Sequence, residues 1–120
     1  MFEQIKKDSP DAWERFEKYI FEKVGWEFKH GRFRNDSQFF DDIYFLIGLL
    51  FTFFDEQGIR IAVIPHTNGT FRPYLFRKAG KVWTFLELED YEYGFSERLE
   101  AWKAAIPKAF EILQKQLEEK

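Results

Sequence analysis

The longest stretch of the chain without a charged residue is IYFLIGLLFTFF, residues 43–54, which lies between acidic pairs at 41–42 and 55–56. A membrane-spanning helix needs about 20 apolar residues, and acidic residues at both ends do not suit one. On a helical wheel, the apolar side chains of this stretch cover an arc of roughly 240°, more than a one-sided surface helix presents. The pattern therefore predicts a central buried helix over residues 38–57, covered by a sheet on one side and by another helix on a second side.

Apolar residues at helical spacing predict one further helix near each end of the chain. The first covers residues 9–24, with Ser9 as N-cap and Pro10 at the first helical position, where its missing N–H group costs nothing. The second covers residues 96–118 and carries a single apolar stripe. Pro107 lies inside this helix and removes one backbone hydrogen bond, so we expect a kink or a break near residue 107.

Residues 59–88 alternate between apolar and polar positions, as strands do, and two turn signals divide them into three strands. Asn68-Gly69 favours a type I′ turn, in which both residues have positive φ, and Ala79-Gly80 marks the second turn. Pro65 conflicts with a tight first hairpin because it cannot donate the expected hydrogen bond. We therefore expect a wider loop or a bulge between residues 65 and 73.

Two-residue turns would decide which side chains share a face of this sheet, because successive residues point to opposite faces. The buried face would carry the aromatic rings together with the odd-numbered residues of the first strand: Ile59, Ile61, Val63, Tyr74, Phe76, Trp83 and Phe85. The exposed face would carry the remaining residues, Arg60, Ala62, Ile64, Leu75, Arg77, Val82, Thr84 and Leu86. The pattern thus predicts a mainly aliphatic outer surface.

The resulting order of elements, α-α-β-β-β-α, predicts an α+β fold in one domain over residues 1–120, with helices packed on one face of a three-stranded antiparallel meander. Aromatic residues make up 21% of the chain, and sixteen of them are phenylalanine. Because each ring buries a large area, we expect a large core, with some apolar surface left for an interface.

The segments DEQG and YEYGFSERLEAWKAAIPKAFEILQKQ, with the short meander between them, resemble a group of small uncharacterised proteins from bacterial genomes and mobile elements. The resemblance covers roughly residues 38–117, and a final helix of the form A-x-x-x-A-I-x-K-A-x-x-I-L carries it. It implies no functional residue. The α-β-β-β-α order also resembles a double-stranded-RNA-binding domain, but the last helix starts with SERLEAWK and lacks the lysine cluster that such a domain presents to phosphates.

The sequence offers little catalytic chemistry. It has no cysteine, so thiol catalysis, disulfides and thiolate metal sites are excluded, and it has no phosphate-binding, dinucleotide-binding or serine-hydrolase motif. His30 and His66 are far apart in predicted loops, and the acidic residues Glu87, Glu89, Asp90 and Glu92 lack the ligand spacing of a calcium loop. We therefore expect no enzyme activity, no cofactor and no metal site. No signal peptide is predicted, and a cytoplasmic location is expected.

Charge is segregated along the chain. Residues 57–86 contain no acid, whereas the acidic residues of the C-terminal half concentrate in the segment that follows. Two hypotheses arise from this pattern. The first, favoured by the net charge of −3 and the aliphatic outer face, is a protein-interaction or regulatory module, with self-association as a homodimer included, using Arg60, Ile64, Leu75 and Arg77. The second is a nucleic-acid-binding protein that uses the connector and the basic meander through Lys29, Arg32, Arg34, Arg72, Lys78 and Lys81.

Overall fold

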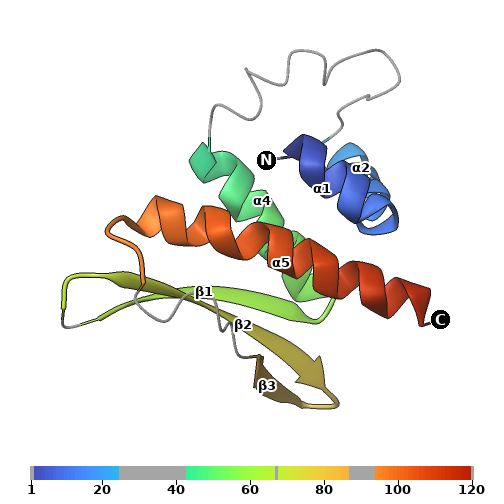
Figure 1. Ribbon diagram of the computed structural model, residues 1–120. Coiled ribbons are helices and arrows are strands. Elements are labelled where there is room, and N and C mark those ends of the chain that lie inside the picture. The colour runs from blue at the N-terminus through green and yellow to red at the C-terminus, as the bar shows by residue number, and fades with distance from the viewer. Residues whose placement is uncertain (1, 25–42, 67, 87–93, 120) are drawn as a thin grey trace.

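A computed structural model of the chain describes residues 2–24, 43–66, 68–86 and 94–119. These residues form an α+β fold in which helices come first, three antiparallel strands follow, and a long helix ends the chain (Figure 1). This confirms the predicted fold class. The elements are α1 (Phe2–Asp8), α2 (Pro10–Val24), α4 (Ile43–Glu56), β1 (Ile59–Pro65), β2 (Phe71–Ala79), β3 (Val82–Leu86) and α5 (Arg98–Glu118).

The elements are arranged in layers. Helices α4 and α5 cross one face of the sheet, and α1 and α2 lie on the side of this helix pair that faces away from the sheet (Figure 1). The opposite face of the sheet carries none of these helices (Figure 1). The sheet therefore has an inner face, which we define as the face toward α4 and α5, and an outer face.

Aromatic rings fill the space between the helices. Phe16 of α2, Phe53 and Phe54 of α4 and Phe110 of α5 are all fully buried, and neighbouring rings lie with their centroids 4.9–5.8 Å apart. Most of these pairs are tilted or edge-to-face, the arrangement that the ring quadrupole favours. The predicted central helix is observed over residues 43–56, where Leu50, Phe53 and Phe54 are buried, and the predicted residues 38–42 lie outside the described part of the chain.

The start of α2 follows the predicted pattern, because Ser9 precedes the helix and Pro10 is its first residue. The first-turn N–H groups, however, find their acceptor in the distant residue Gln114 of α5. Its Oε1 accepts hydrogen bonds from the backbone N–H groups of Asp11 at 2.9 Å and Ala12 at 3.0 Å. Gln114 is only 7% exposed, so this tertiary cap joins the two helices inside the protein. The sequence pattern predicted neither this contact nor helix α1.

Helix α5 begins at Arg98, two residues after the predicted start, and continues through Pro107 to Glu118. The helix is therefore not broken at Pro107, and the expected kink near this residue stays a prediction. The ring removes one hydrogen bond, but the neighbouring Ala105, Ile106 and Ala109 are completely buried, and their packing outweighs that loss.

Candidate nucleic-acid interface

The first hairpin determines which residues occupy the outer face of the sheet. Pro65 pairs with Phe71, and one residue further on the N–H group of His66 donates to the carbonyl of Thr70 at 2.8 Å. The loop between this pair contains three residues, not two. The Gly69 N–H group donates back to the carbonyl of His66 at 3.0 Å, and Gly69 has a φ of 82°. These are the features of a three-residue hairpin with a glycine in the left-handed region.

This geometry corrects the predicted type I′ turn while confirming the wider loop expected near Pro65. Among the described residues, only glycines have positive φ, so Asn68 does not adopt the conformation that a type I′ turn requires. Instead, the Asn68 side chain acts as an acceptor: its Oδ1 accepts hydrogen bonds from the N–H group and the hydroxyl of Thr70. Asparagine commonly stabilises a turn in this way.

One additional loop residue exchanges the two faces of β2 relative to β1, because side chains alternate with a period of two. Ile61 is paired with Leu75, so the two lie on the same face, and both are buried against the helices. Tyr74 and Phe76 of β2 therefore point outward, opposite to the prediction, whereas Phe71 is on the inner face. The second turn is also displaced by one residue, since Ala79 pairs with Val82 and Gly80-Lys81 forms the turn. Phe76 consequently pairs with Phe85, whereas the prediction paired Phe76 with Trp83.

The outer face is a continuous arrangement of aromatic rings. The ring of Phe85 lies 5.8 Å from that of Phe76 and 5.4 Å from that of Tyr74, measured between centroids. The imidazole of His66 is stacked beside Tyr74 at 6.3 Å, and its Nε2 is 3.1 Å from the tyrosine hydroxyl. Phe85 is 49% exposed, so about half of this residue is open to solvent. Trp83 completes the set on β3, paired with Lys78.

Basic side chains lie among these rings. The guanidinium of Arg60 extends across the sheet to the ring of Trp83, 4.2 Å from its centroid, and Nε is 3.2 Å from Asp55 Oδ1 at the rim. Arg72 lies 6.0 Å from the ring of Tyr74. Lys78 is exposed and forms no ion pair within the part of the chain that the structure describes. The described strands contain no acidic residue, so the outer face is positive although the whole chain is negative.

The structure separates the four residues that were predicted to form a protein contact. Arg60 and Ile64 are on the outer face, and Ile64 is 43% exposed. Leu75 is on the inner face and fully buried, so it cannot be a surface contact. Arg77 also belongs to the inner-face set, at an exposed position near the end of β2. The predicted surface is therefore wrong as a unit, and the cause is the three-residue hairpin.

The residues predicted for nucleic acid are brought together only in part. Arg72 and Lys78 share the outer face, and Lys81 is in the adjoining turn. Lys29, Arg32 and Arg34 lie outside the described residues. The alternation of residues, with two-residue turns, predicted that Tyr74, Phe76, Trp83 and Phe85 face the core, whereas they lie on this surface. Pro65, which argued against a two-residue turn, was the signal that could have revealed them.

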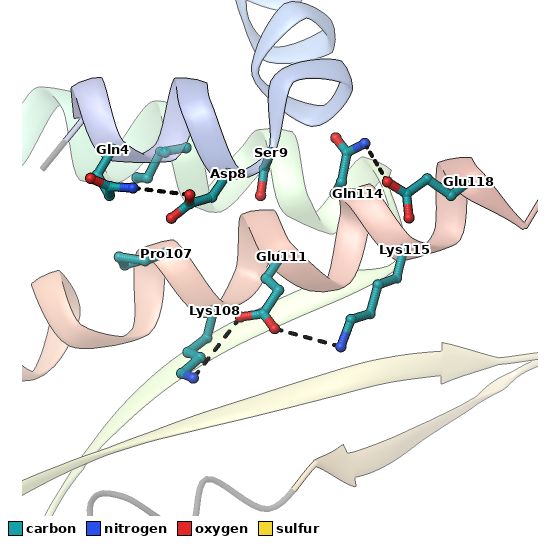
Figure 2. A pocket seen from close by; sticks show the side chains of 10 residues that line it. Gln4, Asp8, Ser9, Pro107, Lys108, Glu111, Gln114, Lys115 and Glu118 are labelled. Carbon is teal, nitrogen blue, oxygen red and sulfur yellow. Dashed lines mark hydrogen bonds and ion pairs between the residues drawn. The ribbon is translucent and has the colours of Figure 1, made fainter.

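A groove lies among the helices, away from the sheet. It has a volume of about 590 Å³ and runs between α1 and α5 (Figure 2). Each charged side chain that lines it has a partner: Glu111 lies between Lys108 and Lys115, at 3.9 Å and 3.5 Å, and Asp8 and Glu118 accept hydrogen bonds from the amides of Gln4 and Gln114 (Figure 2). These pairs leave the groove without an obvious group for a ligand to bind.

Within the described ranges, no group of three or more His, Cys, Asp or Glu side chains is placed to hold a metal ion. Likewise, among the helices that the structure describes, none is long and apolar enough to cross a membrane. Comparison of the chain with protein-family models, curated proteins and solved structures finds no match. The resemblance to small proteins of bacterial mobile elements stays a prediction.

Proposed function

We propose that this protein is a binding module, not an enzyme, and that the outer face of its sheet binds single-stranded nucleic acid. The observation that carries the proposal is the outward position of four aromatic rings among basic side chains, on strands that contain no acid. Stacking of bases on aromatic rings, combined with cations that contact the phosphates, is the usual chemistry of single-strand binding.

The geometry favours single strands over duplexes. An open sheet face offers rings on which an unpaired base can lie, whereas the bases of a duplex are already stacked on each other. Phe85 and Tyr74 are the rings that we assign to base stacking, because Phe85 is widely exposed and Tyr74 lies directly beside it. Lys78 is the cation that we assign to a phosphate.

The proposal is tested by titrating a fluorescently labelled single-stranded oligonucleotide with the full chain and measuring anisotropy at low and high salt. We expect Phe85→Ala to weaken binding by about 1–3 kcal/mol, the range measured for loss of one stacked base. Phe21→Ala is the matched control, because Phe21 is similarly exposed at 44% but lies on α2, away from the sheet. It should leave the affinity unchanged.

Charge is tested separately. Lys78→Gln should lower the dependence of log affinity on log salt by about one unit, as the loss of one phosphate contact requires. Lys18→Gln, on the exposed surface of α2, is the control and should leave the salt dependence unchanged.

Three results would contradict the proposal: binding that does not depend on salt, equal loss in Phe85→Ala and Phe21→Ala, or equal affinity for single strands and a duplex. Light scattering at two concentrations measures the mass of the protein in solution and distinguishes this proposal from the competing protein-contact hypothesis. A dimer that Phe85→Ala converts to a monomer, with no oligonucleotide binding, would make the outer face a self-association surface.

A further inference from the structure

Besides the groove between α1 and α5, a cavity lies on the inner side of the sheet. It is at the end where the first hairpin meets the start of α5. It has a volume of about 550 Å³, within the range of small-molecule sites in proteins. Residues of four elements line it: Ile47 of α4, Val63 of β1, Phe71 of β2, and Arg98, Leu99 and Trp102 of α5. Five of these six side chains are apolar and one is a cation.

The cation is placed to meet a ligand. The guanidinium of Arg98 lies over the ring of Phe71, 5.3 Å from its centroid, and this contact holds the side chain at the edge of the cavity. Arg98 forms no ion pair with any residue in the described part of the chain. A guanidinium presents a planar set of N–H donors that matches the two oxygens of a carboxylate.

The surroundings of Arg98 restrict the charge of that ligand. Among the residues that line the cavity, Arg98 is the only charged one. A dianion would leave its second negative charge uncompensated against an apolar lining, which is costly. A monoanion paired with the guanidinium leaves no such charge.

We propose that this cavity binds a monocarboxylate with an apolar body, such as a medium-chain fatty acid. The carboxylate binds the Arg98 guanidinium, and the hydrocarbon chain lies among Val63, Leu99 and Trp102. Burial of the chain supplies most of the affinity, since each methylene group removed from water contributes about 0.8 kcal/mol. The site is on the opposite face of the sheet from the nucleic-acid surface, so the two proposals stand or fall independently.

Calorimetric titration of the full chain tests the site with three probes used below the concentrations at which they form micelles. Decanoate carries both the charge and the chain, decanamide carries the chain alone, and acetate carries the charge alone. We expect saturable binding of one decanoate per chain, binding of decanamide about tenfold weaker, as expected for a charge-assisted hydrogen bond, and no measurable binding of acetate.

Two arginine variants identify the anchoring group. Arg98→Gln should weaken decanoate to the level of decanamide and leave decanamide unchanged. Arg77→Gln is the control. Arg77 is an exposed arginine on the inner face of β2 that does not line the cavity, so its loss should change the affinity for neither decanoate nor decanamide. Circular dichroism of each variant checks that it is folded.

A third variant, Val63→Phe, fills the cavity from β1 and should weaken both long-chain probes together. The proposal is overturned if decanamide binds as tightly as decanoate, if the two arginine variants weaken binding equally, or if no probe shows saturable binding to the folded chain.

Discussion

The two faces of the sheet are built from alternate residues of the same three strands, yet they differ in composition and in surroundings. The inner face carries Ile59, Ile61 and Leu75, all buried beneath α4 and α5. The outer face carries aromatic rings and cations, with Phe85 about half exposed. Aliphatic side chains pack closely against helices, whereas flat rings with cations between them offer a surface for binding. The comparison shows that hydrophobic content alone does not identify the buried face of a strand.

The largest effect is expected from truncating, one at a time, two adjacent residues of β2 whose side chains point to opposite faces of the sheet. Leu75→Ala should lower the free energy of unfolding by about 2–5 kcal/mol, because it leaves a cavity in a fully buried position. Phe76→Ala should cost about 1 kcal/mol, since it mainly loses a cross-strand ring contact with Phe85. Urea denaturation of both variants measures the difference, and equal losses would contradict the assignment of the two faces.

The next effect concerns the glycine at which the chain returns from the sheet to α5. Gly94 has a φ of 76°, and a Cβ atom there would lie 2.9 Å from Thr70 Oγ1 and 3.0 Å from Arg72 Cγ. Phe95, which follows, is bridged to Phe71 by backbone hydrogen bonds of 2.7 Å and 2.8 Å. Gly94→Ala should therefore destabilise the protein by about 2 kcal/mol or more, through both backbone strain and crowding.

Gly69→Ala is the matched control for this prediction. Gly69 has a similar φ of 82°, but a Cβ atom there would meet nothing within 4 Å. Its substitution should cost about 1 kcal/mol, from backbone conformation alone. If thermal or chemical unfolding shows a larger loss of stability in Gly69→Ala than in Gly94→Ala, the chain at Gly94 is not closely packed beside β2.

A smaller effect is expected on the outer face itself. Arg60→Gln removes the contact with Trp83 and the ion pair with Asp55, and should destabilise the protein by about 0.5–1 kcal/mol. Tryptophan fluorescence should change at the same time, because the indole of Trp83 loses its covering cation. Arg77→Gln is the control and should alter neither property. An unchanged emission spectrum in Arg60→Gln would contradict the placement of the guanidinium on Trp83.

The smallest effect distinguishes the two kinds of hairpin. In the three-residue loop, Asn68→Ala loses only the hydrogen bonds that Oδ1 accepts from Thr70, and should cost about 0.5 kcal/mol. In a type I′ turn, Asn68 would also need positive φ, and the same substitution would cost at least as much as Gly69→Ala. Comparing the urea midpoints of the two variants decides which hairpin forms, and a larger loss in Asn68→Ala would restore the type I′ turn.

The amino-acid sequence determined the local elements, because their signals are contained within short stretches. The charge-free run at 43–54, the Ser9-Pro10 helix start and the alternation from Ile59 onward each predicted the observed helix or strand. Positions that depend on distant partners were not predictable in this way. Gln114 caps α2 from more than a hundred positions along the chain, and buried alanines of α5 hold that helix intact through Pro107.

Only the tertiary structure decided which face of the sheet is buried. Both faces are rich in hydrophobic residues, so each was a plausible core, and the choice depended on whether the loop after His66 holds two residues or three. A change of one residue in that loop reverses every side chain of β2 relative to β1. The packing of α4 and α5 on Ile59, Ile61 and Leu75 favours the three-residue loop. This loop places the aromatic and basic residues at the surface.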